Sequence, residues 1–180
     1  MPYKIKGYTD LPRKNVKDMS SADLSQLRTL LDQYIDKPTD NPVTEHKDAG
    51  NDMSLMIHAD GFLAWHQHFV AKAEHWFVLN GGEKFVPLPY WDPAGSIPAQ
   101  LNKNNNNVNM PLPQNLRLTA LKKIASYILL NNRILPYHND VHDNLGGQMP
   151  NPETSPSDPI FWPFHSFLLA VYEKWRNLKK

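Results

Sequence analysis

The sequence contains no cysteine among its 180 residues. That absence excludes disulfides, thiolate metal sites, thiol nucleophiles and iron–sulfur clusters. An excess of charge of one sign is also missing, because 19 basic and 18 acidic residues give a formal net charge of +1. A chain so balanced lacks the electrostatic footprint of a protein that binds nucleic acid or a membrane surface, so we expect neither partner.

Long apolar runs are missing as well. No stretch reaches the roughly 18 apolar residues of a membrane-spanning helix. Residues 1–6 lack the apolar core of a secretory signal, so we expect a cytoplasmic location, with export of a trimmed mature form left open. The length fits a single domain over residues 1–180, because domains usually have about 100–200 residues.

Apolar residues at helical spacing predict a mainly α protein, an antiparallel helical bundle with long irregular loops. The predicted helices cover about 21–36, 61–79, 116–131 and 158–175, with a short helical turn at 138–142. Ser20 is the predicted N-cap of the first helix, and Asp158, followed by Pro159, is that of the last. Proline, glycine and asparagine predict loops at 1–20, 37–53, 93–115 and 146–156, and Pro136 predicts a break.

The chain has eight histidines, in two groups separated by more than sixty residues. His138 and His142 stand at i, i+4, so both rings share one face of a helix. His66 and His165 each lie on the apolar face of a predicted helix. A buried neutral imidazole needs partners for both ring nitrogens, and a metal ion satisfies one of them. Ligation by imidazole alone suits copper, zinc, iron and nickel.

Two of the eight histidines face elsewhere. His68 and His75 lie about 200° and 180° round the predicted helix from His66, so we expect them to be solvated or to support the site from outside. The other six are candidate metal ligands, three from each half of the chain: His46, His58, His66, His138, His142 and His165. The competing interpretation is that such histidines are hydrogen-bonded core residues.

Four ordered segments carry a family resemblance. Residues 62–66 read FLAWH, residues 89–92 PYWD, residues 138–142 HNDVH and residues 155–165 SPSDPIFWPFH. They resemble the F-L-P-W-H, P-Y-W-D, H-N-x-V-H and S-P-x-D-P-x-F-x-x-H-H segments of the tyrosinase, catechol oxidase and molluscan-type hemocyanin family of type 3 dinuclear copper proteins. The resemblance covers about residues 13–175.

The resemblance implies two copper ions inside the bundle, with residues 46–92 as the first-copper half and 116–175 as the second. It implies that His46, His58 and His66 bind the first copper and that His138, His142 and His165 bind the second. The expected activity is oxidation of a small phenolic substrate by dioxygen, from o-diphenols to o-quinones. The expected aromatic wall of the site consists of Phe62, Trp65, Phe161 and Phe164.

We rank o-diphenol oxidation above monophenol hydroxylation. A free phenol has a pKa near 10, so hydroxylation needs a group that helps to remove the proton. Asn139 matches an asparagine of the family, but residues 127–130 lack the glutamate that usually accompanies it. Our hypothesis is that Asp143 or Asp140 acts as the base. Pro152 falls where the family has its substrate-gate residue.

Three alternatives stay open. The first is a hemocyanin-like reversible oxygen carrier, which a short chain without a covering β domain disfavours. The second is an o-aminophenol oxidase of a biosynthetic pathway, which would use the same copper core. The third is a helical bundle whose histidines bind no copper. The sequence leaves undetermined the oligomeric state, the physiological substrate and the route of copper loading.

Overall fold

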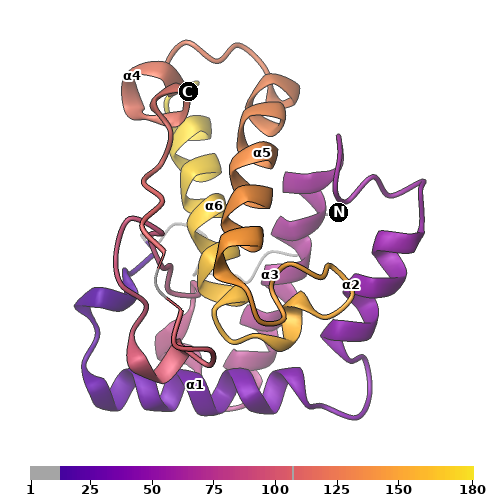
Figure 1. Cartoon of the computed structure of the whole chain (residues 1–180), viewed down its shortest axis with the longest axis vertical. Coiled ribbons are helices and arrows are strands. Elements are labelled where there is room, and N and C mark those ends of the chain that lie inside the picture. Colours follow the sequence, from indigo (N-terminus) through magenta and orange to yellow (C-terminus); the bar gives the residue numbers. More distant parts are fainter. Residues whose placement is uncertain (1–12, 107) are drawn as a thin grey trace.

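A computed structural model describes residues 13–106 and 108–180, which fold mainly into helices (Figure 1). The expectations for residues 1–12, an irregular start and no secretory signal, lie outside the described residues. In the described part of the chain the β pairing is a single isolated parallel bridge, between Asn15 and Tyr90. The mainly α prediction is therefore confirmed. The helices are α1 Ser21–Ile35, α2 Pro42–Asn51, α3 Phe62–Leu79, α4 Leu118–Leu121, α5 Tyr127–Leu145 and α6 Phe161–Asn177.

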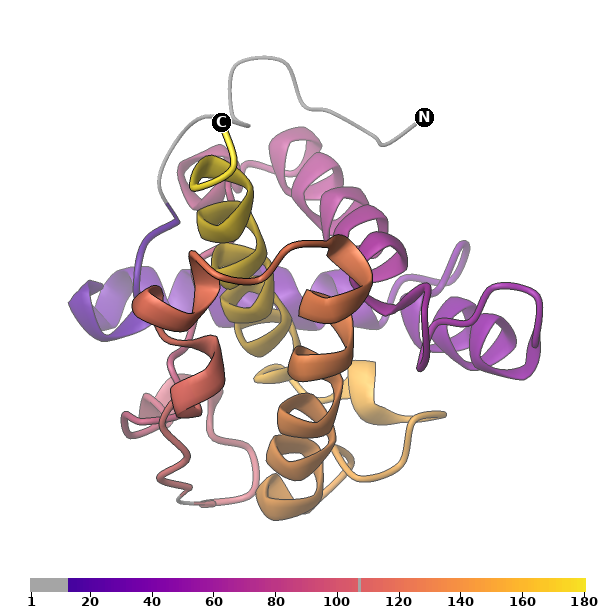
Figure 2. The ribbon, with the colours of Figure 1, turned by 90° about the horizontal axis from the view of Figure 1, so that it is seen from above.

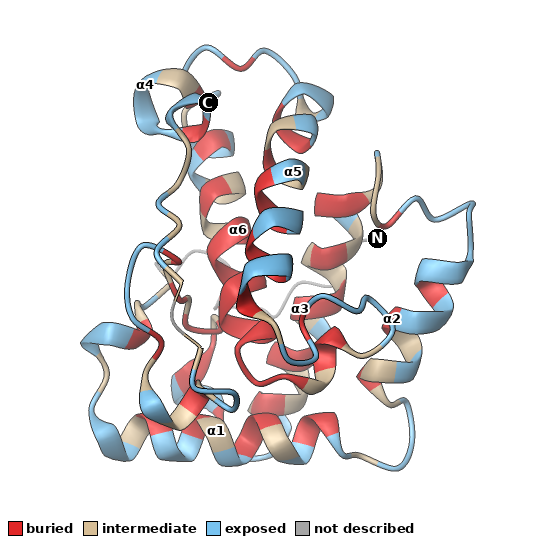
Figure 3. Cartoon of the chain, viewed as in Figure 1, coloured by how far each residue is buried: buried red, intermediate tan, exposed pale blue. Residues whose placement is uncertain are grey.

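Helices α5 and α6 run side by side in opposite directions, and α3 packs against α6 (Figure 1). Helix α1 lies across the lower end of this bundle and passes beneath it when the molecule is seen from above (Figure 2). Helix α5 is buried on the face turned toward the interior and exposed on its outer face, whereas α6 is buried on all sides over residues 161–169 and reaches the surface only toward its C-terminal end (Figure 3). The core therefore lies between α3, α5 and α6. No helix of the described residues is long and apolar enough to cross a membrane.

Two of the predicted helices form as expected. Helix α1 begins where the Ser20 hydroxyl accepts a hydrogen bond from the Asp23 amide at 3.1 Å, and its leucines are buried. Helix α3 runs over the predicted residues and gives way to Gly81, whose φ of 78° is one that glycine adopts without strain.

The predicted loop at 37–53 is wrong, because it contains α2. The side chain of Asn41 accepts hydrogen bonds from the amides of Val43 and Thr44, and Pro42 occupies the first helical turn. This cap-and-proline signal is the one used to predict the last helix, and it starts α2 for the same reason: proline has no N–H that the first turn must satisfy. The correction matters because α2 carries His46.

The predicted helix at 116–131 and the break at Pro136 are also wrong. Only α4 forms in the first part, and α5 begins at Tyr127 after its Ser126 cap and continues through Pro136 to Leu145. Pro136 cannot donate to the carbonyl of Asn132, but both residues are exposed, so water can satisfy that carbonyl. His138 and His142 therefore lie on a long helix and not on a separate turn.

The last helix begins slightly later than predicted. The carboxylate and carbonyl of Asp158 accept hydrogen bonds from the amides of Ile160 and Phe161, which forms a turn before α6 starts at Phe161. The sequence signal therefore marks the entry to the helix and not its first residue, a common uncertainty of one or two residues.

A buried ion cluster ties the start of the described chain to the bundle. The Arg13 side chain is 7% exposed and contacts Glu74 of α3 at 2.7 Å and Glu173 of α6 at 3.0 Å. Glu74 also accepts a hydrogen bond from the amide of Leu88 at 2.8 Å. The start of the described chain and the segment at Leu88 are thus joined to α3 and α6, the helices that carry His66 and His165.

Candidate metal centre

The second histidine group lies on two antiparallel helices. His138 and His142 share the inner face of α5, and their ring centroids are 4.2 Å apart because i, i+4 positions are neighbours on a helix. His165 of α6 faces them, with its ring 5.1 Å from that of His138 and 5.3 Å from that of His142. All three side chains are buried, and a ligand nitrogen from each lies within 4.8 Å of the others, so the group can hold a metal ion.

The first histidine group comes from three segments. His46 lies on α2, His58 on the loop that follows it, and His66 on α3. The ring of His46 is 5.3 Å from that of His58 and 5.5 Å from that of His66. Ligand nitrogens of these residues also lie within 4.8 Å of one another. His46 and His66 are buried, whereas His58 is only partly so.

The two groups share one hollow. The ring of His66 stacks on that of His165 with centroids 4.7 Å apart, and it lies 6.1 Å from that of His138. Contacts of this kind cannot arise from sequence spacing, because a long stretch of chain separates the groups. The packing of α3 against α6 brings them together.

Five of the six rings are oriented by a hydrogen bond at Nδ1. Within their own helices, His66 bonds to the carbonyl of Phe62 at 2.9 Å and His165 to that of Phe161 at 2.8 Å. A carbonyl oxygen accepts only, so each Nδ1 carries the proton and each Nε2 presents a lone pair. The acceptor for His46 is the carbonyl of Pro152, for His142 that of Met149, and for His138 the side chain of Asn139. Among the described residues the ring of His58 has no such bond.

The inward-facing nitrogens lack donors. Nε2 of His66 and Nε2 of His142 are buried without a hydrogen-bond partner, and Nε2 of His138 lies 3.2 Å from Nε2 of His165. With both Nδ1 atoms protonated, that last pair brings two lone pairs together, which is unfavourable unless a cation lies between or beside them. The donor set therefore fits metal ions bound through Nε2.

Burial keeps the rings neutral. Desolvation, reinforced by the neighbouring His58, lowers the pKa of His46 to about 3. Burial likewise lowers the pKa of His142 to about 4 and the pKa values of His66, His138 and His165 well below the usual range. A neutral imidazole is the form that binds a metal, so the proton competes weakly here at neutral pH.

Aromatic rings enclose the histidines, as expected from the sequence. The Phe62 ring lies 4.6 Å from that of His66 and 4.5 Å from that of His138. Phe161 stacks on His165 at 3.8 Å, and Phe164 lies parallel to the ring of His138. Trp65 is only partly buried and contacts His46 at 5.5 Å. The wall is therefore dry around the second group and thinner beside the first.

The two residues proposed for proton transfer lie differently. Asn139 is next to the site, where its Oδ1 accepts the hydrogen bond from His138. Asp143 is exposed on α5 and lies outside both histidine groups, as does Asp140. A role for either aspartate as base stays a prediction. His68 and His75 also lie outside both groups.

Three supporting groups were missed at the sequence level. Asn131 of α5 accepts a hydrogen bond from the amide of Leu63 at 3.1 Å and donates to the carbonyl of Ala59 at 2.8 Å, which joins α5 to the segment carrying His58. Asn131 precedes His138 by seven residues, so helical phase would have placed it on the inner face. The carbonyls of Met149 and Pro152 left no signal, since any residue supplies one.

Comparisons with known proteins agree with this geometry. Residues 96–178 match the family model described as the common central domain of tyrosinase, a range that contains the second histidine group. The chain is 42% identical to a tyrosinase of Hahella sp. (strain CCB-MM4), over 63% of this chain and 34% of that protein. It is also 23% identical to the G-type hemocyanin (units Oda to Odg) of Enteroctopus dofleini, over 93% of this chain and 7% of that protein.

A tyrosinase-like protein of Caenorhabditis elegans is 24% identical over 66% of this chain and 24% of that protein. The chain thus spans about a third or less of the length of these relatives. No solved structure matches.

Proposed function

This chain belongs to the tyrosinase family of type 3 copper proteins, and we propose that it oxidises o-diphenols to o-quinones with two copper ions and dioxygen. One observation carries the proposal. Imidazoles from both halves of the chain, fixed at Nδ1, turn their unprotonated Nε2 atoms into one aromatic hollow. A core histidine that only needed hydrogen bonds would not leave its second nitrogen facing another lone pair.

The proposed ligands are His46, His58 and His66 for the first copper and His138, His142 and His165 for the second. When bound, the two ions supply the electrons and the binding place for reducing dioxygen. The remaining work belongs to the chain. Oxygen acceptors at Nδ1 hold five of the six rings at one angle and make their Nε2 atoms better donors to the metal.

The aromatic wall has a separate role. Phe62, Phe161 and Phe164 are fully buried around the rings and exclude water from the second group. Imidazoles whose pKa lies far below neutrality stay uncharged there, so the ligands add no charge to that of the ions. A hollow of this kind favours chemistry that would be lost to side reactions in water.

We propose that substrate approaches from the side of His58. It is the least buried of the six histidines, and Trp65, which contacts His46 and His66 of the same group, is also partly exposed. A phenol ring can stack on such an aromatic edge and leave its hydroxyl pointing at the histidines. Partial exposure at one ligand is the feature that favours an enzyme over a sealed oxygen carrier.

Diphenols are the preferred substrates under this proposal. No carboxylate belongs to either histidine group among the described residues. Asn139 is committed to His138 and is neutral, so it cannot remove the proton of a phenol whose pKa is near 10. A catechol needs less help, because its oxidation requires no new carbon–oxygen bond.

Oxygen consumption by the copper-loaded chain tests the proposal. We expect steady uptake with catechol, slower turnover of L-tyrosine after a lag, and two coppers per chain by elemental analysis. The variant His68→Gln, outside both groups, should behave like the parent, whereas His165→Ala should lose turnover. No copper uptake, or rapid tyrosine hydroxylation without a lag, would contradict the proposal or its ranking. Turnover of o-aminophenol above that of catechol would reassign the substrate.

Reversible oxygen binding is the second candidate. One relative, which aligns with 93% of this chain, is named a hemocyanin. If this is the function, the copper-loaded chain would bind oxygen and release it under vacuum. It would show no sustained oxygen consumption when catechol is added. The same sample therefore separates the two functions.

A further inference from the structure

The loop formed by residues 146–156, called the carbonyl loop below, reaches both histidine groups. Its Met149 carbonyl accepts from Nδ1 of His142 at 2.6 Å, and its Pro152 carbonyl accepts from Nδ1 of His46 at 2.8 Å. His66 and His165 are instead oriented by carbonyls of their own helices. One ligand of each group thus depends on where a single loop lies.

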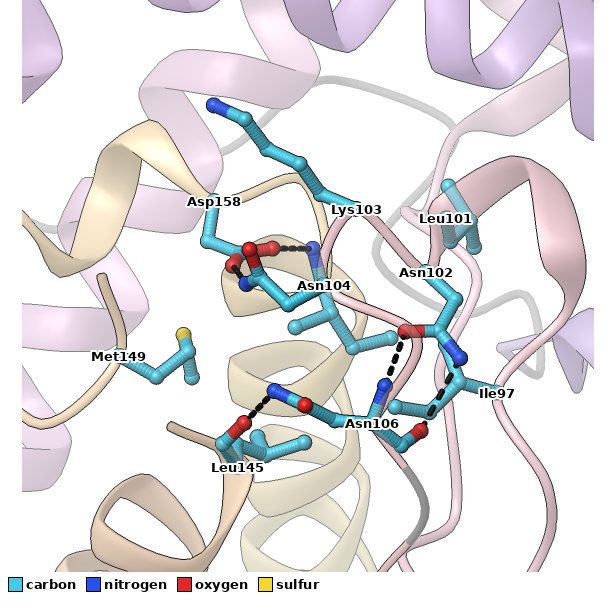
Figure 4. Close-up of a pocket in the computed structure, with 10 residues that line it drawn as sticks. Ile97, Leu101, Asn102, Lys103, Asn104, Asn106, Leu145, Met149 and Asp158 are labelled. Atoms are coloured by element: carbon cyan, nitrogen blue, oxygen red, sulfur yellow. Dashed lines mark hydrogen bonds between the residues drawn. The ribbon is translucent and has the colours of Figure 1, made fainter. Parts of the chain in front are cut away.

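The asparagine-rich segment 102–106 holds both ends of that loop. Asn106 donates its side-chain amide to the carbonyl of Leu145, the residue before the loop. Asn104 donates to the carboxylate of Asp158, just after the loop, at 2.9 Å (Figure 4). Reciprocal hydrogen bonds between Asn102 and Asn106, at 3.0 and 2.9 Å, close the segment on itself.

The loop is shaped to receive these amides. Gly146 and Gly147 have φ of 64° and 60°, a conformation that side chains rarely adopt, and a Cβ on Gly147 would collide with the Asn104 amide. Asp158 is 1% exposed, so its carboxylate depends on the bonds from Asn104 and from the Ile160 amide. A cavity of about 10 Å³ lies among these residues, roughly the room for one water.

We propose that Asn104 and Asn106 are positioning residues for the metal centre, which hold the carbonyl loop so that Met149 and Pro152 orient one ligand in each group. The inference rests on the proposed function for the identity of the metal, but not for the hydrogen bonds. It gives the asparagines of the predicted loop at 93–115 a role, which is to hold the two ends of the carbonyl loop. It also links the two metal sites, because loosening one loop weakens a ligand of both.

The first test uses the metal-free full chain. Solvent exchange of the histidine Nδ1 protons is measured by NMR in the parent, Asn104→Ala and Asn106→Ala. We expect exchange at His46 and His142 to accelerate by about tenfold or more, while His66 and His165 keep the parent rate. The latter two are internal controls, because general destabilisation would accelerate all four. Equal acceleration at all four, or none, would overturn the inference.

The second test is titration with Cu²⁺ and, separately, Zn²⁺. Loss of a group that orients a metal ligand typically weakens binding by about 10–100-fold, so we expect both sites to weaken together by about tenfold in each variant. Asn109→Ala is the matched control, an exposed asparagine of the same loop, and Asn104→Gln should recover part of the affinity.

The outcomes separate the two proposals. A parent that binds no metal overturns the proposed function, while the proton exchange still decides the role of Asn104 and Asn106. A parent with two sites that both variants retain at full affinity overturns the inference alone.

Discussion

The two histidine groups do the same chemical task but are built in different ways. The second uses two long antiparallel helices, and its three side chains are 1–7% exposed. The first uses a helix, a loop and another helix, and His58 is only partly buried. Local helix geometry therefore preforms the second group, whereas long-range contacts assemble the first.

Those long-range contacts come from the second half of the chain. Pro152 orients His46, and Asn131 of α5 holds the segment around Ala59 beside His58. The Nδ1 atoms of His142 and His165 bond instead to carbonyls of their own half of the chain. We infer that the second group acts as a template on which the first is ordered.

Acidification of the metal-free chain should give the largest effect. The buried histidines stay neutral in the folded state. In the unfolded state they bind protons as the pH falls through about 6.5, so the free energy of unfolding decreases below that pH. Each contributes about 1.4 kcal/mol per pH unit until its folded pKa is reached, which is about 3 for His46 and about 4 for His142. Five such groups together remove about 10 kcal/mol by about pH 5, a large share of the roughly 5–15 kcal/mol of a typical domain.

Urea unfolding between pH 7.5 and 5 measures this effect. His142→Phe should reduce the slope of the unfolding free energy against pH by the equivalent of about one proton. His58→Phe should reduce this slope by less, since His58 is partly exposed. A stability that is constant over this range would contradict the neutral, buried state of both groups. Saturating Zn²⁺ should make the free energy of unfolding fall more steeply as the pH drops, because protons displace the metal.

Removal of single ligands should give the next largest effect. His165→Ala leaves two buried imidazoles facing an empty space, whereas His58→Ala leaves a position that water can fill. We expect both to lower catechol turnover by more than about 100-fold, because even outer-shell changes cost 10–100-fold. Only His165→Ala should also prevent tight binding of the second metal, measured as copper per chain. Equal copper loss in both variants would remove the distinction between the groups.

The sequence predicted the second group better than the first for a physical reason. His138 and His142 meet through helix spacing, and the apolar periodicity of α6 places His165 on its inner face. These are local properties that a pattern contains. Even the error at Pro136 did no harm, because a turn and a long helix put an i, i+4 pair on the same face.

His46 was a candidate ligand because His68 and His75 face elsewhere, but only the family resemblance assigned it to the first copper. The cap-and-proline signal of α2 was overlooked in a segment rich in proline and glycine, so this histidine was placed in a loop. Its partner, the Pro152 carbonyl, lies 106 residues away and belongs to the backbone. No side-chain pattern encodes such a contact, which follows only from the packed fold.

Asn131→Leu should separate the groups with a smaller effect. The change keeps the shape but leaves the Leu63 amide without a partner, which costs about 1–3 kcal/mol of stability, while the Ala59 carbonyl keeps the hydrogen bond from the Phe62 amide. We expect the first metal to bind about tenfold more weakly and the second to be unchanged in a two-step Zn²⁺ titration. Asn132→Leu, an exposed neighbour, is the control. Equal weakening of both steps would argue against a template role for the second group.

Asp143→Asn should give the smallest effect, and it tests whether a general base lies beside the second group. A positioned general base is worth about 10²–10⁴ in rate, but Asp143 is exposed beside His142, so we expect tyrosine hydroxylation to fall by no more than about tenfold. Catechol oxidation should not change, because it needs no help from this carboxylate, and Asp140→Asn on the same helix tests the other candidate base. An equal loss of turnover with both substrates would show that Asp143 acts on the metal site itself. A loss of tyrosine turnover beyond about 100-fold would mean that the bound substrate draws the carboxylate toward the site. A small, substrate-selective loss would instead confirm that the rigid second group is built for ligation and has no strong base of its own.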